Sequence, residues 1–543
     1  MLHIAYRLSR PTVRRLAIVA LVMLVAGLLL ATTAQAQGGA RSAAVVLLRG
    51  ADTILVQRST RGLTRVTTVV DGRGMPRITV NYDLAPGHRI AGASFSAQGP
   101  GAPADAAPIQ RGTVRFAGDT AHLTITAGSN ERKLSPATKP GAMPLFNNDF
   151  TVLEQGVRIA RARGVTSLTL PLLLLANAQT VDASLELFAP DSARFTIMGN
   201  VTVASVDADG NITGGYLPGQ NITLRVLVGP EAARIGIGAP DYSAPAGAPY
   251  RVESVVVRTP AGHSLTGTLS IPTGARGRVP AVVTITGSGQ QDRDESISLV
   301  PGFRLFRQVA DTLGRRGIAV LRLDDRGVGG SGGDVNGTTA DFADDIRAGV
   351  AYLRTRSEID GARVALVGHS EGGMIAPMVA ADDRRLAAIV LMAGPSDRGD
   401  SVIAFQLRSA VQQDPSIAPA ARDSALAAIR AQFDSTSGKL AWMQYFLTYD
   451  PLPTIRRVRQ PVLILQGATD LQVTADQAPK LERALRDAGN RRVTTHVFPD
   501  RNHLFLRDSI GAPSGYSRLP SGRVDDEVMG TLADWLVATL RPN

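Results

Sequence analysis

The amino-acid sequence predicts two folded domains: a β-rich domain, followed by an α/β domain with a mainly parallel sheet. The chain has 543 residues, more than the roughly 250 to 300 residues that one hydrophobic core usually supports. Residues 37–245 hold short β-type runs separated by turn residues, whereas residues 246–543 alternate apolar β-type runs with helical segments. A stretch rich in Pro, Ala and Gly at 239–250 is the expected linker.

Residues 1–36 have the organisation of a secretory signal peptide. Four arginines precede an apolar run over 16–30, and the small-residue site Ala34-Gln35-Ala36 comes after it. The apolar run is shorter than the roughly 20 residues that span a bilayer. We therefore expect cleavage after Ala36 and a periplasmic or secreted protein without a stable membrane anchor. An uncleaved anchor is the alternative, and Arg14-Arg15 leaves twin-arginine export open as the route.

Composition and charge exclude several other classes. The formal net charge is +11, which becomes +7 once the four signal-peptide arginines are removed, and the remaining arginines are scattered. This distribution lacks the basic stripe expected of a nucleic-acid-binding surface. The chain has no cysteine, which excludes a disulfide framework and a lipid-attachment cysteine.

The first half carries the alternating pattern of half-buried strands. Turn residues separate runs such as TRVTTVV, RITVNYDL and NITLRVLVG. This pattern predicts an antiparallel sheet, a sandwich or an open barrel. His88 and His122 are isolated and are expected to be structural, so we predict an accessory domain without a catalytic site.

The second half has the pattern of a crossover sheet. After a hairpin at 252–272, helical segments separate most of the apolar runs PAVVTITG, GIAVLRLDD, RVALVGHS, LAAIVLMAG and PVLILQGATD. Such alternation predicts a mainly parallel sheet with right-handed crossovers. Functional sites in these sheets lie at the carboxyl ends of the strands, so we expect the chemistry there.

Two serines stand in G-x-S-x-G patterns. Ser370 comes after the strand RVALV and precedes the small-residue helix GGMIAPMVAA, which is the context of a nucleophile elbow. Ser331 lies in DDRGVGGSGGDVNG, a glycine-rich loop with no apolar helix after it. We therefore predict that Ser370 is the nucleophile.

A serine nucleophile needs a base oriented by a carboxylate. Of the seven histidines, His503 lies after the last strand and is the candidate base, whereas His369 adjoins the serine and is expected to point away. Asp470 lies after the strand PVLILQG and is the expected acid in the chain order Ser, acid, His. Asp397 is the fallback, and Asp500 is expected to be a turn residue.

The oxyanion needs two backbone N–H groups. One is predicted to come from Glu371, next to the nucleophile, and the other from Ser288, or alternatively Gly289, in the loop TITGSGQQDRDES. The charged clusters at 292–295 and 324–326 are expected to form a salt-bridged loop scaffold, with pocket lining as the alternative.

Residues 396–457 form an insertion with helical periodicity where a lid is expected. Its Trp442 and Phe446 are candidates for substrate binding in an acyl pocket. Packing within the helical core is the alternative for such aromatic side chains.

The second half also resembles a known family. The motifs are GSGQQDRDES, GIAVLRLDDRGVGGSGG, VGHSEGGMIAP, LMAGP, YDPLPTIRRVRQPVLILQGATDLQV and NHLF. Over roughly residues 250–543 they look like the exported esterase and serine-aminopeptidase-like branch of the α/β-hydrolases. The resemblance implies the α/β-hydrolase fold with a helical lid, the triad of Ser370, Asp470 and His503, and oxyanion donors at Glu371 and Ser288. Thr286 stands where many relatives have histidine, and Asn502 where glycine is commoner.

These observations predict an exported serine esterase that cleaves a small carboxylic ester through an acyl-enzyme, without a metal or cofactor. A peptidase or amidase with the same triad is the first alternative. A non-catalytic envelope-binding protein is the second. Arg293 and Arg326 are expected to neutralise acidic residues near the site, and together with an apolar lid this favours an ester over a peptide.

Overall fold

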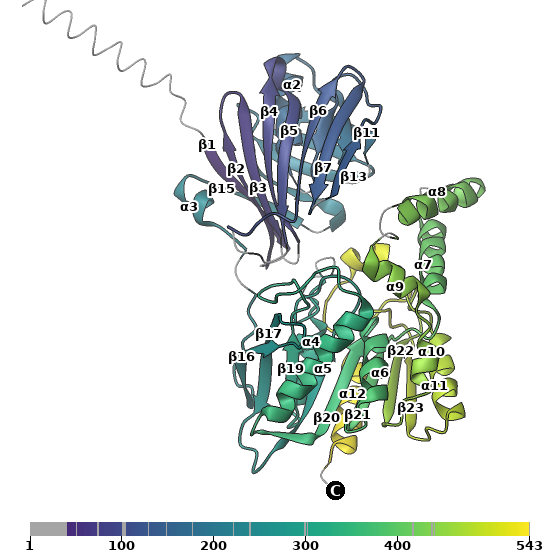
Figure 1. Ribbon diagram of the computed structural model, residues 1–543. Helices are drawn as coiled ribbons and strands as arrows, with labels where there is room; N and C mark the ends of the chain where they lie inside the picture. Colours follow the sequence, from purple (N-terminus) through teal and green to yellow (C-terminus); the bar gives the residue numbers. More distant parts are fainter. Residues whose placement is uncertain are drawn as a thin grey trace, which may run out of the picture.

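The structure is a computed structural model that describes residues 41–541, except for short gaps at 50–51, 73–74, 100–101, 103–104, 129, 148, 176–177, 221, 238–239, 298–299, 301, 415–416, 436–437 and 439. The expected signal peptide lies outside the described residues. Figure 1 shows a β-rich part and an α/β part stacked along the long axis of the molecule. In the part of the chain that is described, no helix is both long and apolar enough to cross a membrane.

The β-rich part is one 15-stranded sheet in the order β8-β7-β6-β5-β4-β3-β2-β1-β15-β14-β13-β12-β11-β10-β9. Neighbouring strands are antiparallel except for β9 and β10, which are parallel. The strands are β1 (Arg41–Arg49), β2 (Asp52–Arg61), β3 (Arg65–Gly72), β4 (Arg77–Ala85), β5 (Arg89–Gln98), β6 (Gln110–Ala117), β7 (Thr120–Ala127), β8 (Asn130–Leu134), β9 (Met143–Leu145), β10 (Ser167–Leu174), β11 (Gln179–Ala189), β12 (Ser192–Ile197), β13 (Asn200–Val206), β14 (Ile212–Leu217) and β15 (Ile222–Val228). The edge strand β9 lies against β5, so the sheet rolls up as an open barrel.

Helix α2 (Thr151–Ala162) packs on the concave side of this sheet, against β5, β9, β10 and β11. Its buried face includes Val152, Leu153 and Val157. Gly156 allows the close approach, because a Cβ there would meet a methyl group of Leu170 at 2.7 Å. Our expectation of strands alone in this half misses the helix, although its buried residues Leu153, Val157 and Ala160 recur at helical spacing over its 12 residues.

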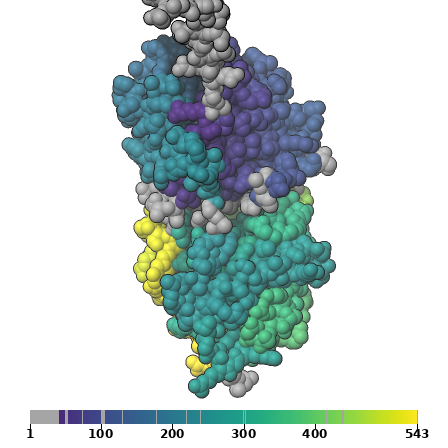
Figure 2. Space-filling view, turned by 90° about the vertical axis from the view of Figure 1, so that its left-hand side faces the viewer, coloured from purple at the N-terminus to yellow at the C-terminus, as the bar shows by residue number. Residues whose placement is uncertain are grey.

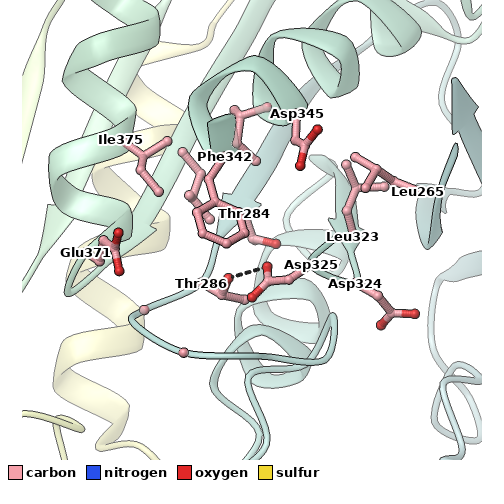
Figure 3. A pocket seen from close by; sticks show the side chains of 14 residues that line it. Leu265, Thr284, Thr286, Leu323, Asp324, Asp325, Phe342, Asp345, Glu371 and Ile375 are labelled. Atoms are coloured by element: carbon pink, nitrogen blue, oxygen red, sulfur yellow. Dashed lines mark hydrogen bonds between the residues drawn. The ribbon is translucent and has the colours of Figure 1, made fainter. Parts of the chain in front are cut away.

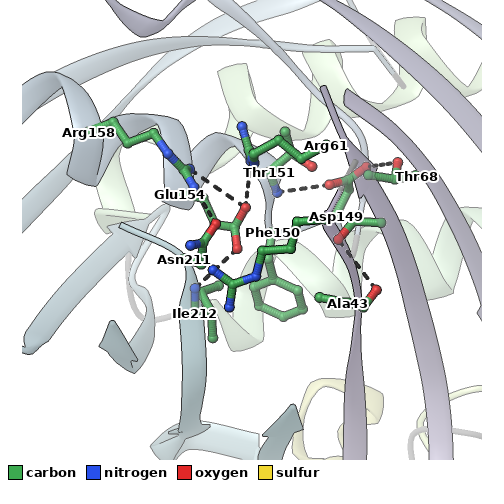
Figure 4. Close-up of polar contacts among 12 residues, drawn as sticks. Ala43, Arg61, Thr68, Asp149, Phe150, Thr151, Glu154, Arg158, Asn211 and Ile212 are labelled. Carbon is green, nitrogen blue, oxygen red and sulfur yellow. Dashed lines mark hydrogen bonds and ion pairs between the residues drawn. The ribbon is translucent and has the colours of Figure 1, made fainter. Parts of the chain in front are cut away.

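Buried polar contacts fix the start of α2 (Figure 4). The carboxylate of Asp149 accepts hydrogen bonds from Thr68 Oγ1 at 2.6 Å, Tyr82 Oη at 2.9 Å and the backbone N–H of Thr151 at 2.9 Å. Burial raises the pKa of Asp149. One turn further on, Glu154 pairs with Arg61 at 2.6 Å, so the helix is tied to strands as well as packed on them.

The α/β part is an eight-stranded sheet in the order β16-β17-β19-β18-β20-β21-β22-β23, antiparallel only at β16–β17 and β17–β19. This confirms the predicted mainly parallel sheet. The strands are β16 (Tyr250–Arg258), β17 (Ser264–Pro272), β18 (Val279–Ile285), β19 (Ala319–Leu323), β20 (Ile359–His369), β21 (Ala388–Met392), β22 (Val462–Gly467) and β23 (Val493–Phe498).

Helices cover both faces of this sheet. One apolar core lies beneath α4 (Leu305–Gly314) and α12 (Asp526–Thr539). The other lies beneath α5 (Thr339–Thr355), α6 (Gly372–Asp382) and α11 (Gln477–Asp487). The central strands are therefore buried on both sides, which explains their continuous apolar sequences.

The chain between β21 and β22 forms the helices α7 (Gly399–Gln413), α8 (Arg422–Ser435), α9 (Ala441–Thr448) and α10 (Pro451–Ile455). Three of them, α7, α8 and α9, lie at the end of the sheet that faces the β-rich part (Figure 1). These helices occupy the segment in which the sequence places a lid.

The two parts also touch directly. The turn η2 (Pro218–Gln220) of the β-rich part contacts η5 (Pro513–Arg518) of the α/β part. Tyr242 lies in the segment that connects the two parts. The centre of its ring lies 4.2 Å from the guanidinium of Arg293 in the α/β part. Figure 2 shows the β-rich part stacked on one end of the α/β part.

Candidate active site

Ser370 occupies the turn between β20 and α6. Its φ angle is +53°, a conformation that only a few residues other than glycine adopt and that is strained. Backbone hydrogen bonds hold the turn, from Ser370 N–H to Met392 O at 2.9 Å and from Gly373 N–H to Ser370 O at 2.8 Å. The geometry is that of a strand-to-helix elbow that presents a side chain at the end of the sheet.

The glycines around Ser370 are sterically required. A Cβ on Gly368 would clash with the carbonyl of Gly372, and a Cβ on Gly372 would clash with the carbonyl of Ile285 at the end of β18. The strand, the turn and the helix therefore approach each other so closely that neither Gly368 nor Gly372 could carry a side chain.

His503 and Asp470 are brought together from separate loops. His503 Nδ1 lies 2.7 Å from Asp470 Oδ2, and both residues are buried. The other carboxylate oxygen of Asp470 accepts the backbone N–H groups of Gln472 at 2.7 Å and Val473 at 2.9 Å. These contacts fix the carboxylate and, through it, the histidine ring.

The alternative residues are placed elsewhere. Ser331 is buried, and its Oγ accepts the N–H of Thr266 at 2.9 Å and donates to Asp324 O at 3.0 Å, so it holds the glycine-rich loop in place. Asp397 forms an ion pair with Lys480 at 3.0 Å. Asp500 is a turn residue with a φ of +52°.

Ser370 and His503 line one cavity of about 360 Å³. Trp442 and Phe446 of α9 line it as well, and Pro513 and Tyr516 come from the segment η5 that touches the β-rich part. The wall of the cavity is therefore built from the elbow, the lid helices and the segment under the β-rich part.

The oxyanion candidates differ in position. Ser288 and Glu371 line the cavity, and among the described hydrogen bonds none uses the N–H of either residue. Gly289, the alternative donor, has a φ of +97° and lines a different cavity. The N–H of Gly287 is already bound to Glu295 Oε1 at 2.9 Å.

Trp442 also has a polar contact that the sequence does not predict. Its indole Nε1–H donates to Glu371 Oε1 at 2.9 Å, and Thr339 Oγ1 donates to the same oxygen at 2.6 Å. Burial raises the pKa of Glu371, although these hydrogen bonds and one from Ser288 oppose the shift. Glu371 thus connects the lid helix α9 to the elbow.

His369 has contacts that the sequence does not predict. Its ring centre lies 4.9 Å from that of His503. Its Nδ1 lies 2.7 Å from Glu295 Oε1, and its Nε2 lies 2.9 Å from the carbonyl oxygen of His503. The backbone turns at Ser370 in such a way that the preceding side chain points beneath the catalytic loops, and no local sequence signal predicts this.

The charged loops form an ion-paired scaffold. Arg293 pairs with Asp324 at 2.6 Å, Arg326 pairs with Asp345 at 2.7 Å, and Arg322 pairs with Asp294. Neither Arg293 nor Arg326 has a described contact with Glu371 or Glu295, the two acids next to the nucleophile. These arginines are bound to other carboxylates, whereas Glu371 and Glu295 are bonded to neutral donors or to histidine.

A second, smaller cavity of about 30 Å³ lies behind the oxyanion loop (Figure 3). It shares Gly287 and Glu371 with the larger one. Asp325 lines it, accepts a hydrogen bond from Thr286 Oγ1 at 2.7 Å, and has its pKa raised well above the usual range by burial. Thr286 therefore holds this carboxyl group in place.

Comparison with known proteins agrees with this architecture. The model of the alpha/beta hydrolase family matches residues 299–511. Esterase EstD of Thermotoga maritima is 29% identical over 321 residues, which span 56% of this chain and 72% of that protein. Acylamino-acid-releasing enzyme 2 of Oryza sativa subsp. japonica is 27% identical over 169 residues, which span 29% of this chain and only 19% of that protein.

Among solved structures, the Pyrococcus furiosus esterase Pf2001 is similar, with 16% identity and a TM-score of 0.40 over 55% of this chain and 95% of that one. The eight-stranded sheet, the elbow and the family match lie in the same half of the chain. The C-terminal half of this protein therefore belongs to the α/β-hydrolase superfamily, and it is preceded by a large β-rich region.

Proposed function

We propose that this protein is a serine esterase, in which Ser370 attacks a carboxylic ester and His503 and Asp470 activate it. The observation that carries the proposal is the 2.7 Å contact between His503 and the buried Asp470, together with the cavity that His503 and the strained Ser370 both line. A serine hydroxyl is a weak nucleophile, and this arrangement supplies the base and the carboxylate that orients it.

The reaction can be derived from this geometry. His503 takes the Ser370 hydroxyl proton through Nε2 while Asp470 holds the Nδ1–H, so that the imidazole keeps the correct tautomer. The N–H groups of Ser288 and Glu371 would stabilise the oxyanion of the tetrahedral intermediate. His503 then gives its proton to the leaving alcohol. In the second half of the reaction, His503 takes a proton from water as the water attacks the acyl group, and it returns the proton to Ser370 as the carboxylic acid leaves.

An ester is favoured over a peptide because no carboxylate is available for a substrate ammonium group among the described residues next to the nucleophile. Glu371 and Glu295 stand there but are only 3% and 2% exposed. Glu371 accepts hydrogen bonds from Thr339 and Trp442, and Glu295 holds His369 and Gly287. In addition, Phe446 and Met443 give the cavity an apolar wall suited to an acyl chain.

A peptidase is the second candidate, because these acids lie next to Ser370 without an arginine partner in the described structure. The two candidates are separated by kcat/KM for p-nitrophenyl butyrate and for aminoacyl p-nitroanilides, measured with the same preparation. We expect the ester value to be larger by orders of magnitude, since the amine of an amide is a poorer leaving group than the alcohol of an ester. An anilide value equal to the ester value would establish the peptidase instead.

We also propose export of the protein to the periplasm or the medium. The support is the sequence of residues 1–36, with arginines, an apolar run and Ala34-Gln35-Ala36 in order.

A further inference from the structure

Three loops of the candidate site converge on one pair of buried side chains, Glu295 and His369. Glu295 Oε1 accepts the N–H of Gly287, which begins the oxyanion loop, at 2.9 Å. His369 Nδ1 lies 2.7 Å from the same oxygen. The other ring nitrogen of His369 lies 2.9 Å from the main-chain carbonyl of His503. The pair therefore connects the oxyanion loop, the elbow strand and the loop of the base.

The hydrogen-bond partners of His369 limit where the protons of this pair can lie. A neutral imidazole has one N–H, but both ring nitrogens of His369 face oxygens that accept. The carbonyl of His503 has no proton to give, and Glu295 Oε1 already accepts from Gly287. Both contacts are satisfied together when one proton lies between His369 Nδ1 and Glu295 Oε1 while Nε2–H donates to the His503 carbonyl, as in an imidazolium beside the Glu295 carboxylate.

The surroundings agree with a charged pair. Burial opposes the imidazolium, but the Glu295 carboxylate, the His503 carbonyl and Asp470 outweigh it and raise the pKa of His369. The other acidic groups around the pair are Asp470 after β22, Glu371 at the elbow and Asp325 after β19, and the basic neighbour is His503. No arginine is among the contacts described for Glu295 or His369.

Glu295 has two features that are costly without a compensating role. Its φ is +51°, and its Oε2 is a buried oxygen without a hydrogen-bond partner in the described structure. Strained backbone and unpaired buried acceptors persist where other contacts require them. Here the strained turn places Oε1 within hydrogen-bonding distance of both Gly287 and His369.

We propose that Glu295 and His369 form a positioning pair, whose shared proton holds the oxyanion loop and the His503 loop in register for the attack by Ser370. This inference rests on the proposed serine-hydrolase function and adds two positioning residues that do not touch the substrate. Loss of the proton would leave His369 with one N–H for two acceptors, so that one of the loops would be released.

Two substitutions separate the two contacts. The amide of His369→Asn places a donor near the former Nδ1 and keeps the Glu295 contact, whereas that of His369→Gln places it near the former Nε2 and keeps the His503 contact. Glu295→Gln keeps the size of the acid but removes its charge. We expect each variant to lower kcat by on the order of 10- to 100-fold with KM within about threefold, because misplaced catalytic groups affect chemistry more than binding.

The pH profile distinguishes the pair from an ordinary core contact. The pKa of His369 is raised above its ordinary value, so His369 keeps its proton to a higher pH than an ordinary histidine and loses it as pH rises through the raised pKa. Wild-type kcat should therefore fall on the alkaline side, and in Glu295→Gln the fall should begin at lower pH. The two His369 variants should lack this alkaline fall.

His263→Gln is the matched control, because His263 forms another histidine–carboxylate pair, partly buried, with Asp345 at 3.0 Å and does not line the catalytic cavity. Each full-length variant is assayed for the rate of fluorophosphonate labelling, for kcat and KM with p-nitrophenyl butyrate, and for thermal unfolding. Slow labelling in the pair variants, with normal labelling of His263→Gln and cooperative unfolding, supports the proposal. Wild-type labelling rates in the pair variants would overturn it, as would a loss shared by His263→Gln or an unfolded variant. A wild-type protein that is not labelled at all would instead overturn the proposed function.

Discussion

His503 Nδ1 and Asp470 Oδ2 lie 2.7 Å apart although 33 positions separate them in the chain. The contact forms because β22 and β23 are parallel neighbours, so that the loops at their carboxyl ends meet. Asp470 lies in the loop after β22, and His503 lies in the loop after β23. The topology of the sheet therefore brings a base and a carboxylate together at the edge where Ser370 stands.

The nucleophile is tested by exchanging each of the two candidate serines. Ser370→Ala should abolish fluorophosphonate labelling and lower ester turnover by several orders of magnitude, because members of a triad act as a unit. Ser331→Ala is the control, since Ser331 is the other serine in a G-x-S-x-G pattern and its described bonds are to Thr266 and Asp324. Labelling that persisted in Ser370→Ala would refute the assignment.

The acid is tested by a pair of aspartates on neighbouring loops. Asp470→Asn should lower kcat by on the order of 10⁴-fold, because an amide favours the wrong tautomer of His503. Asp397→Asn should keep nearly full activity, since Asp397 is bound to Lys480. Steady-state kinetics with p-nitrophenyl butyrate measures kcat of both variants. A larger loss of kcat in Asp397→Asn than in Asp470→Asn would make Asp397 the acid of the triad instead.

The contact between the lid and the elbow can be followed by tryptophan fluorescence, because the chain has only two tryptophans. In Trp535→Phe, emission reports Trp442 alone, whose Nε1–H donates to Glu371 at 2.9 Å. Burial raises the pKa of Glu371, so the carboxylate should take up its proton, and the emission should change, at a pH above the usual range of glutamate.

The control for this titration is Trp535→Phe combined with Glu371→Gln. That double variant has no acid at the indole N–H of Trp442, so its emission should stay constant over the same pH range. An unchanged titration in the double variant would show that another group is responsible.

Export makes a prediction about the mature N-terminus. Cleavage after Ala36 should leave Gln37 as the first residue of protein recovered from a periplasmic extract. Intact-mass measurement gives the answer. Recovery of the full 57.1 kDa chain in the membrane fraction would contradict cleavage.

The sequence by itself predicts those features that depend on local pattern. Alternation and turn residues predict the strands of the first half, and apolar runs between helices predict the parallel sheet of the second. The elbow around Ser370 is also local, because Gly368 and Gly372 are needed wherever a strand turns this sharply into a helix. Chain order and strand ends then point to Asp470 and His503.

Contacts between distant segments were decided by the tertiary structure alone. Helix α2 has an apolar face that its own sequence shows, but its burial inside the rolled sheet depends on strands far away in the chain. The partners of Arg293 and Arg326 depend on which side of their loops faces the core, and they bind Asp324 and Asp345 instead of the acids beside Ser370. His369 and Glu295 meet for the same reason. Periodicity fixes which residues share a face of one element, whereas only packing fixes which loops approach one another.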